Sequence, residues 1–176
     1  MEAREILSQQ LDEWIKLGAP DNPWQRYLVD NGIEFESRPL DPQLRERLMR
    51  PQFRRDNRRK NCFMNAQRLA LHHREIDYYE GVVFLNGWTI PITHGWNAHN
   101  GAIIDMTYRT KMGSRNVHTL GDVPQNTAYL GVKIPEEDIY STMYSHHLWM
   151  SILDDWVCRF PFINKTEHRD GVRGVA

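Results

Sequence analysis

The sequence predicts an α+β fold in which helices pack on an antiparallel sheet. Helical patterns of apolar residues fill the N-terminal part of the chain, and runs rich in β-branched and aromatic residues follow them. The sheet is predicted to include residues 78–85, 88–98 and 102–107. Two Asn-Gly pairs, Asn86-Gly87 and Asn100-Gly101, separate these runs, and this dipeptide is a strong signal for a tight turn between antiparallel strands.

The N-terminal part of the chain predicts three helices and one short strand. The first helix covers residues 3–17, and Gly18 is its expected C-cap. Asn22-Pro23 opens the second helix, because proline suits the first helical turn. A strand over residues 33–36 is expected before the third helix, which begins at Asp41-Pro42. The side chains expected to face the core are Ile6, Leu7, Leu11, Trp14, Ile15, Trp24, Tyr27, Leu28, Leu44 and Leu48.

The Asn100-Gly101 pair sets the register of the last two predicted strands. If this pair forms a two-residue loop, Trp96 lies opposite Asp105. Side chains alternate between the faces of a sheet, so His94, Trp96 and Asp105 share one face. His94 and Asp105 are then diagonal neighbours, roughly 7–8 Å apart between backbones, and their side chains can bridge that distance.

Cys62 begins the next predicted helix, for which Asn61 is the expected N-cap. In the first helical turn, the positive end of the helix dipole favours the thiolate, which is the reactive form of cysteine. Cys62, His94 and Asp105 provide the nucleophile, the general base and the orienting carboxylate that acyl transfer requires. The residues that recur at helical spacing after Cys62 are Ala66, Leu69, Ala70 and His73.

Four segments resemble the core of the transglutaminase-like branch of the papain-like cysteine hydrolase superfamily. They are Cys62-Phe63-Met64-Asn65-Ala66, Tyr79-Glu80-Gly81-Val82-Val83, His94-Gly95-Trp96-Asn97 and Ile104-Asp105-Met106-Thr107. The resemblance covers residues 61–107. The segment Tyr129-Leu130-Gly131-Val132 is similar to one in small, uncharacterised bacterial and bacteriophage relatives. The resemblance implies the same roles for the helix-borne Cys62, for His94 and for Asp105. Phe63 and Met64 depart from the family, in which small residues often surround the nucleophile.

The expected activity is that of a cysteine hydrolase, peptidase or acyltransferase that acts on an amide or ester. The substrate would be a peptide, a protein or a small molecule, and hydrolysis and transfer both remain open because they use the same three groups. The candidate substrate-binding residues are Trp96, Asn61 and Gln52. Trp96 is expected mainly to pack, and Asn61 or Gln52 would assist the Cys62 backbone N–H in an oxyanion hole. No cofactor is expected.

A catalytically silent protein with the same fold is the alternative. A cysteine on an apolar helix face is often a small core residue, and the bulky Phe63 and Met64 are compatible with that role. Asp105 would then cap the turn after its strand. Such a protein, of the kind that bacteriophages encode, would bind or inhibit a host or partner protein.

Metal and nucleic-acid binding are weaker expectations. Adjacent histidines such as His72-His73 and His146-His147 point in different directions on a helix, so each pair supplies at most one ligand. A metal held by Cys62, His94 and Asp105 is a minor alternative. The basic run of Arg54, Arg55, Arg58, Arg59 and Lys60 is better explained as a solvated loop than as a phosphate-binding surface, and nucleic acid is an improbable partner.

Composition predicts one domain in a reducing compartment. The chain has 176 residues, of which 40% are hydrophobic and 26% charged, as in ordinary soluble proteins. The net charge of −1 gives no general case for binding to membranes or nucleic acids, and no apolar run is long enough to span a bilayer. Two cysteines suit a cytoplasmic protein better than a disulfide framework. Residues 1–164 are expected to form the domain, with 61–107 as its catalytic core.

The C-terminal third predicts a polar loop, a long helix and a loose tail. The loop covers residues 109–127 and is expected to border the site. The helix begins at Pro135 and is the longest predicted in the chain, and residues 165–176 form the flexible tail. The side chains at core spacing along this helix are Ile139, Met143, His147, Met150, Leu153 and Trp156.

Overall fold

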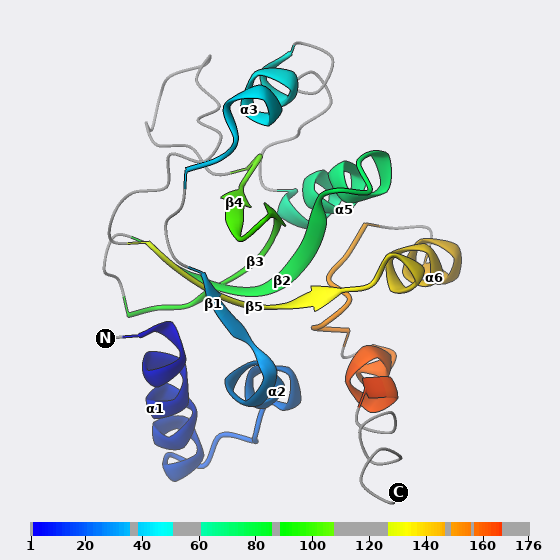
Figure 1. The fold of residues 1–176 in the computed structure, drawn as a ribbon. Coiled ribbons are helices and arrows are strands. Elements are labelled where there is room, and N and C mark those ends of the chain that lie inside the picture. Colours follow the sequence, from blue (N-terminus) through cyan, green and yellow to red (C-terminus); the bar gives the residue numbers. More distant parts are fainter. Residues whose placement is uncertain are drawn as a thin grey trace, which may run out of the picture.

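The structure, a computed structural model, describes residues 2–35, 39–50, 61–85, 89–107, 127–146, 149–155 and 157–166. These residues form the predicted α+β fold, in which helices pack on a curled antiparallel sheet of five strands (Figure 1). The strand order is β1-β5-β2-β3-β4. None of the helices in these ranges is long and apolar enough to cross a membrane.

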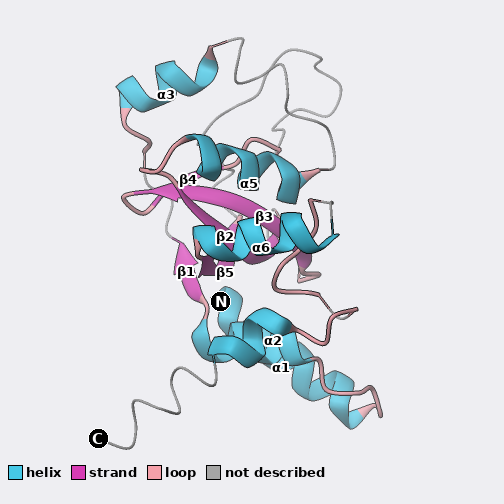
Figure 2. Cartoon of the chain, turned by 90° about the vertical axis from the view of Figure 1, so that its right-hand side faces the viewer, coloured by secondary structure: helices cyan, strands magenta, loops and turns pink. Residues whose placement is uncertain are grey.

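The labelled helices pack on one face of the sheet, in groups toward its opposite ends. The strands are β1 (Ile33–Phe35), β2 (Asp77–Phe84), β3 (Ile92–His99), β4 (Ala102–Ile104) and β5 (Ala128–Ile134). The labelled helices are α1 (Ala3–Lys16), α2 (Pro23–Asn31), α3 (Pro42–Met49), α5 (Cys62–His72) and α6 (Glu136–His146). Figure 2 shows α3 and α5 at the end of the sheet that carries β3 and β4, and α1 and α2 at the end that carries β1 and β5.

Three apolar clusters hold these elements together. Helices α1, α2, α5 and α6 share the largest cluster with one face of the sheet, while α3 packs against α5 and β4 in a second. The opposite face of the sheet carries the third cluster, whose buried members are Tyr79, Val83, Trp96, Ala98, Ile103 and Tyr129. This division matters for the site, because neighbouring residues of β3 contribute to different faces.

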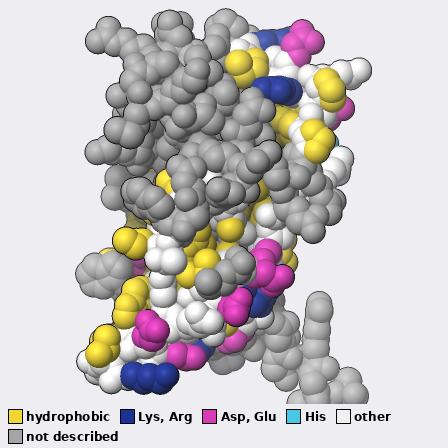
Figure 3. Space-filling view, turned by 90° about the vertical axis from the view of Figure 1, so that its left-hand side faces the viewer, with side chains coloured by type: hydrophobic (Ala, Val, Ile, Leu, Met, Phe, Trp, Pro, Cys, Tyr) yellow, Lys and Arg dark blue, Asp and Glu magenta, His cyan; other side chains and the backbone are white. Residues whose placement is uncertain are grey.

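The N-terminal helices begin where the sequence predicts them. Pro23 opens α2, and the Asp41 carboxylate accepts the Leu44 N–H at the start of α3, 2.8 Å away. The last turn of α1 differs from the prediction, because Trp14 and Ile15 are 41% and 39% exposed. Figure 1 shows this end of α1 pointing away from the sheet, and Figure 3 shows apolar side chains exposed on that part of the surface.

The predicted register of the β3–β4 hairpin is confirmed. Asn97 pairs with Ile104, and His99 pairs with Ala102. The turn residues Asn100 and Gly101 have φ values of 50° and 78°, and positive values at both positions are what a tight type I′ turn requires.

Two predicted strands are longer than the observed ones. Strand β3 begins at Ile92, and residues 89–91 are not part of it; Pro91 lacks the N–H that a strand would use. Strand β4 ends at Ile104, because the Asp105 carboxylate accepts the Thr107 N–H at 2.8 Å and turns the chain. The expected Asn86-Gly87 turn lies outside the described residues.

The largest error in the predicted fold concerns the C-terminal part of the chain. Strand β5 was not predicted, although it lies between β1 and β2 in the sheet. The long helix predicted from Pro135 to Trp156 is wrong, because α6 ends at His146 and residues 149–155 are not helical. Residues 161–166 form a further short helix, so the expected tail from 165 does not begin before residue 167, outside the described residues.

Candidate active site

Asp105 uses its two carboxylate oxygens for different purposes. Oδ1 accepts the Thr107 N–H that turns the chain after β4. Oδ2 lies 2.7 Å from Nε2 of His94 and accepts the hydroxyl of Tyr129 at 2.9 Å. The carboxylate is therefore held by three groups, and its side chain is only 2% exposed. The predicted proximity of His94 and Asp105 is present, and Tyr129 is a partner that the sequence did not predict.

A buried aromatic layer supports the His94 ring. The Trp96 ring lies nearly parallel to it, with ring centres 6.4 Å apart and planes 14° apart, and Tyr129 packs against Trp96 at 5.1 Å. Trp96 is 0% exposed, so it packs, as expected, and offers no surface to a substrate. A Cβ at Gly131 would lie 2.3 Å from the Trp96 ring, which explains why glycine occupies this place on β5.

Cys62 reaches His94 at the edge of the sheet. Helix α5 packs on the face opposite to the His94 ring, where Asn97 donates a hydrogen bond to the Ala66 carbonyl at 2.9 Å. Strand β4 ends beside Asn97, so it does not extend alongside Gly95. There the Gly95 N–H donates to the Cys62 sulfur. The thiol thus lies where β4 would have continued, within hydrogen-bond contact of His94.

The site favours a thiolate beside an imidazolium. Burial acts against ionisation of the Cys62 thiol, but the hydrogen bond and charge of His94 and the N–H groups of Gly95 and Phe63 outweigh it and lower the thiol pKa. Burial also acts against charged His94, yet Asp105 and then Cys62 raise its pKa to about 10. Because Nε2 faces Asp105, Nδ1 is the nitrogen left for the sulfur.

The bulky Phe63 is accommodated because Gly95 has no side chain. A Cβ at Gly95 would lie 2.9 Å from Cδ1 and 3.2 Å from Cα of Phe63, so α5 approaches β3 closely at this point. Asn65 ties the same helix to the turn after β4, since its amide donates to the Thr107 hydroxyl at 2.9 Å. The helix and the Asp105 turn are thereby fixed to each other.

The other predicted site residues receive less support. Asn61 is exposed and precedes α5, but its side chain makes no capping hydrogen bond, so the expected N-cap contact is absent. Gln52, the basic run at 54–60 and residues 109–126 of the predicted polar loop lie outside the described residues. These positions therefore stay predictions.

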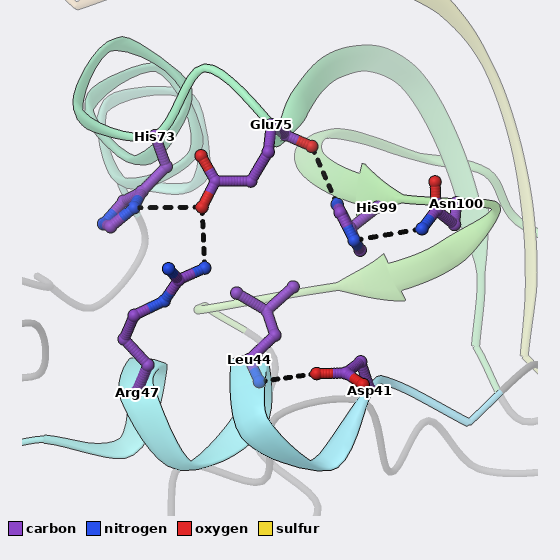
Figure 4. Close-up of polar contacts among 7 residues, drawn as sticks. All are labelled: Asp41, Leu44, Arg47, His73, Glu75, His99 and Asn100. Atoms are coloured by element: carbon purple, nitrogen blue, oxygen red, sulfur yellow. Dashed lines mark hydrogen bonds and ion pairs between the residues drawn. The ribbon is translucent and has the colours of Figure 1, made fainter.

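His73, the residue after the end of α5, belongs to a polar cluster beside that helix (Figure 4). Glu75 accepts a hydrogen bond from Arg47 of α3 at 2.6 Å and lies 3.7 Å from His73. Burial, followed by nearby charges, lowers the His73 pKa despite this carboxylate. Within the described residues, no three His, Cys, Asp or Glu side chains are grouped to hold a metal ion.

Comparison of the chain with known protein families, curated proteins and solved structures found no match. Besides Tyr129, sequence reasoning missed the Gly95 N–H as a partner of the thiol. The signal for Tyr129 was the apolar and aromatic run at 128–134, which is typical of a strand. The contact between the Gly95 N–H and the thiol depends on the end of β4 at Ile104, which the sequence prediction placed too far along the chain.

Proposed function

We propose that this protein is a cysteine-dependent acyl-transfer enzyme of the transglutaminase-like type, acting on an amide or ester. The observation that carries the proposal is His94 held between Asp105, at 2.7 Å, and Cys62, whose thiol pKa is lowered. In this arrangement Cys62 is the nucleophile, and Asp105 orients the His94 ring and favours its protonated form. His94 holds its proton before the reaction begins, so its first task is that of an acid.

The proposed reaction proceeds in two halves. Thiolate attack on the carbonyl carbon forms a C–S bond, and the π electrons move to the carbonyl oxygen. Collapse of this intermediate breaks the C–N or C–O bond, and the imidazolium gives its Nδ1 proton to the leaving group. Neutral His94 then takes a proton from the water or amine that attacks the thioester, and the second collapse releases the Cys62 thiolate.

The direct test compares the two cysteines of the chain. Iodoacetamide labelling from about pH 5 to about pH 9 should modify Cys62 down to the acid end of this range, where an ordinary thiol near pKa 8.5 is protonated. Cys158 is the internal control, because partial desolvation and the negative charge of Asp155 raise the pKa of its thiol, although the side chain is exposed. Cys158 should therefore stay protonated and unlabelled at the acid end of the range. The measurement is the labelled fraction of each cysteine-containing peptide by mass spectrometry.

A matched variant links this reactivity to the site. His94→Gln should raise the thiol pKa of Cys62 and leave that of Cys158 unchanged. Equal labelling of the two cysteines at low pH would contradict the proposal. A reactive Cys62 in a protein that turns over no amide or ester probe would favour the catalytically silent alternative.

A further inference from the structure

A buried carboxylate lies under helix α5, on the face of β2 that this helix covers. Glu80 is 1% exposed and accepts hydrogen bonds from four donors. They are the hydroxyl of Tyr78 at 2.5 Å, the hydroxyl of Ser151 at 2.6 Å, the N–H of Ile152 at 2.9 Å and the N–H of Leu153 at 3.0 Å. Burial raises the pKa of Glu80, and these donors act in the opposite direction.

Stability alone is a weak reason for this group to be buried. A buried carboxylate loses its hydration, and well-packed apolar residues of similar volume often replace buried charged groups without loss of stability. Residues 149–155 also give up the helical continuation that their apolar spacing predicts, and two of their N–H groups bind Glu80 instead. An effect on the neighbouring site is a stronger reason for the network.

Tyr78 connects Glu80 to the residues that hold the nucleophile. Gly95, whose N–H donates to the Cys62 sulfur, is the register partner of Glu80. A Cβ at Gly95 would lie 3.1 Å from the Tyr78 hydroxyl oxygen, so this hydroxyl lies directly beside Gly95. On the other side, Gln67 of α5 donates to the Tyr78 hydroxyl at 3.1 Å.

The same glutamine closes the network around α5. Its amide also donates to the Met150 carbonyl at 2.8 Å, next to the Ser151 that binds Glu80. The strand β2, the helix α5 and residues 150–153 are thus joined through Glu80, Tyr78 and Gln67. Each link is a hydrogen bond between buried or half-buried groups, where competition from water is small.

We propose that Glu80, acting through Tyr78, is a positioning residue that sets the approach of α5 to Gly95 and so holds the Cys62 sulfur against the Gly95 N–H and His94. This inference rests on the proposed function and adds a residue that does not touch the reacting atoms. The thiol pKa reports the position of the sulfur, because hydrogen bonds to the thiolate lower that pKa only at short distance.

The sharpest variant is Tyr78→Phe, which keeps the ring and removes the hydroxyl that joins Glu80 to α5. Tyr79→Phe is the matched control, because it makes the same change one residue further on, on the opposite face of β2. The background is Cys158→Ser, and the measurement is the pH dependence of Cys62 alkylation below the melting temperature of each variant. Tyr78→Phe should raise the apparent thiol pKa and reduce labelling near pH 6 by about tenfold, as one lost hydrogen bond allows.

Glu80→Gln separates positioning from a direct electrostatic effect. Of the titratable groups in the described chain, His94 and Tyr78 interact with Cys62. Glu80 contacts Tyr78, and Asp105, which Tyr129 also contacts, faces His94. Removing the negative charge of Glu80 would by itself make the thiolate easier to form and lower its pKa. Loss of position raises the thiol pKa, so the two explanations predict opposite signs, and positioning predicts a rise in both variants.

The outcomes distinguish this inference from the proposed function. A low thiol pKa in the parent that both variants retain, even with lower melting temperatures, would overturn the positioning role and leave the proposed function intact. A fall in the thiol pKa of Glu80→Gln would also overturn it. An ordinary thiol pKa in the parent would overturn both. Should Tyr78→Phe fail to fold, Glu80→Gln alone decides by its sign.

Discussion

Replacing Asp105 by asparagine tests the site at the carboxylate that contacts His94 and also caps the turn after β4. The amide oxygen of the introduced side chain can still accept the Thr107 N–H, so the turn after β4 should persist. The amide NH₂ must then occupy the place of Oδ2, where His94 and Tyr129 both direct hydrogens at distances of 2.7 and 2.9 Å. An NH₂ group cannot accept these bonds, so His94 should become neutral and carry its proton on Nδ1.

The expected size of the effect follows from the lost bond. Hydrogen bonds to charged groups contribute about 1.5–3 kcal/mol, which corresponds to a roughly 10- to 150-fold smaller population of the thiolate–imidazolium pair. The assay is the rate of Cys62 alkylation near neutral pH, with the unfolding free energy measured in urea. Asp105→Ala is the control, since it also removes the cap of the turn and should be the less stable variant. An alkylation profile of Asp105→Asn equal to that of the parent would refute the orienting role.

Three further predictions concern the residues around this contact. Cys62→Ala should lower the unfolding free energy by less than about 2 kcal/mol, because removal of a half-buried sulfur leaves a small cavity. The same variant should lose alkylation at position 62 and any enzymatic turnover. In that variant Asp105 still raises the pKa of His94, so protonated His94 should stabilise the fold fully below the unfolded value of about 6.5. This contribution should be lost as the pH rises through the folded value, which should lie below the parent's value of about 10 because Cys62 no longer raises it, and urea unfolding across this range measures the loss. Gly131→Ala places a Cβ 2.3 Å from the Trp96 ring. We therefore expect the free energy of unfolding, measured in urea, to fall by about 1–3 kcal/mol and Cys62 to be alkylated more slowly. An unchanged free energy of unfolding would show that the aromatic layer shifts to accommodate the methyl group at little cost.

Features of the fold that depend on neighbouring residues were predictable from the sequence. The Asn100-Gly101 turn fixed the β3–β4 register, and the register brought His94 near Asp105 without information from elsewhere in the chain. The start of α5 at Cys62 was likewise predictable from the helical spacing that follows it. These signals lie within a few residues of the structure that they specify.

Features that depend on distant partners were not predictable in this way. Tyr129 contacts Asp105 from β5, which lies between β1 and β2 and so depends on pairing with segments far away in the sequence. The predicted long helix is not present at residues 149–155, where Glu80, some seventy residues earlier in the chain, accepts the N–H groups of Ile152 and Leu153 instead. Apolar spacing indicates which side chains are buried, but it does not indicate which backbone groups a buried carboxylate will bind.

The position of the Cys62 thiol depends on where β4 ends, and Asp105 determines that point. Capping of a turn and orientation of a histidine were alternative roles for this residue, yet its two oxygens perform one each. The bond from Thr107 turns the chain away from β3, which leaves the Gly95 N–H to the Cys62 sulfur instead of to a longer β4. The other oxygen of this carboxylate, Oδ2, holds the His94 imidazole that contacts the sulfur. Local turn chemistry therefore creates the space for the thiol and also supplies the charge that favours its ionised form.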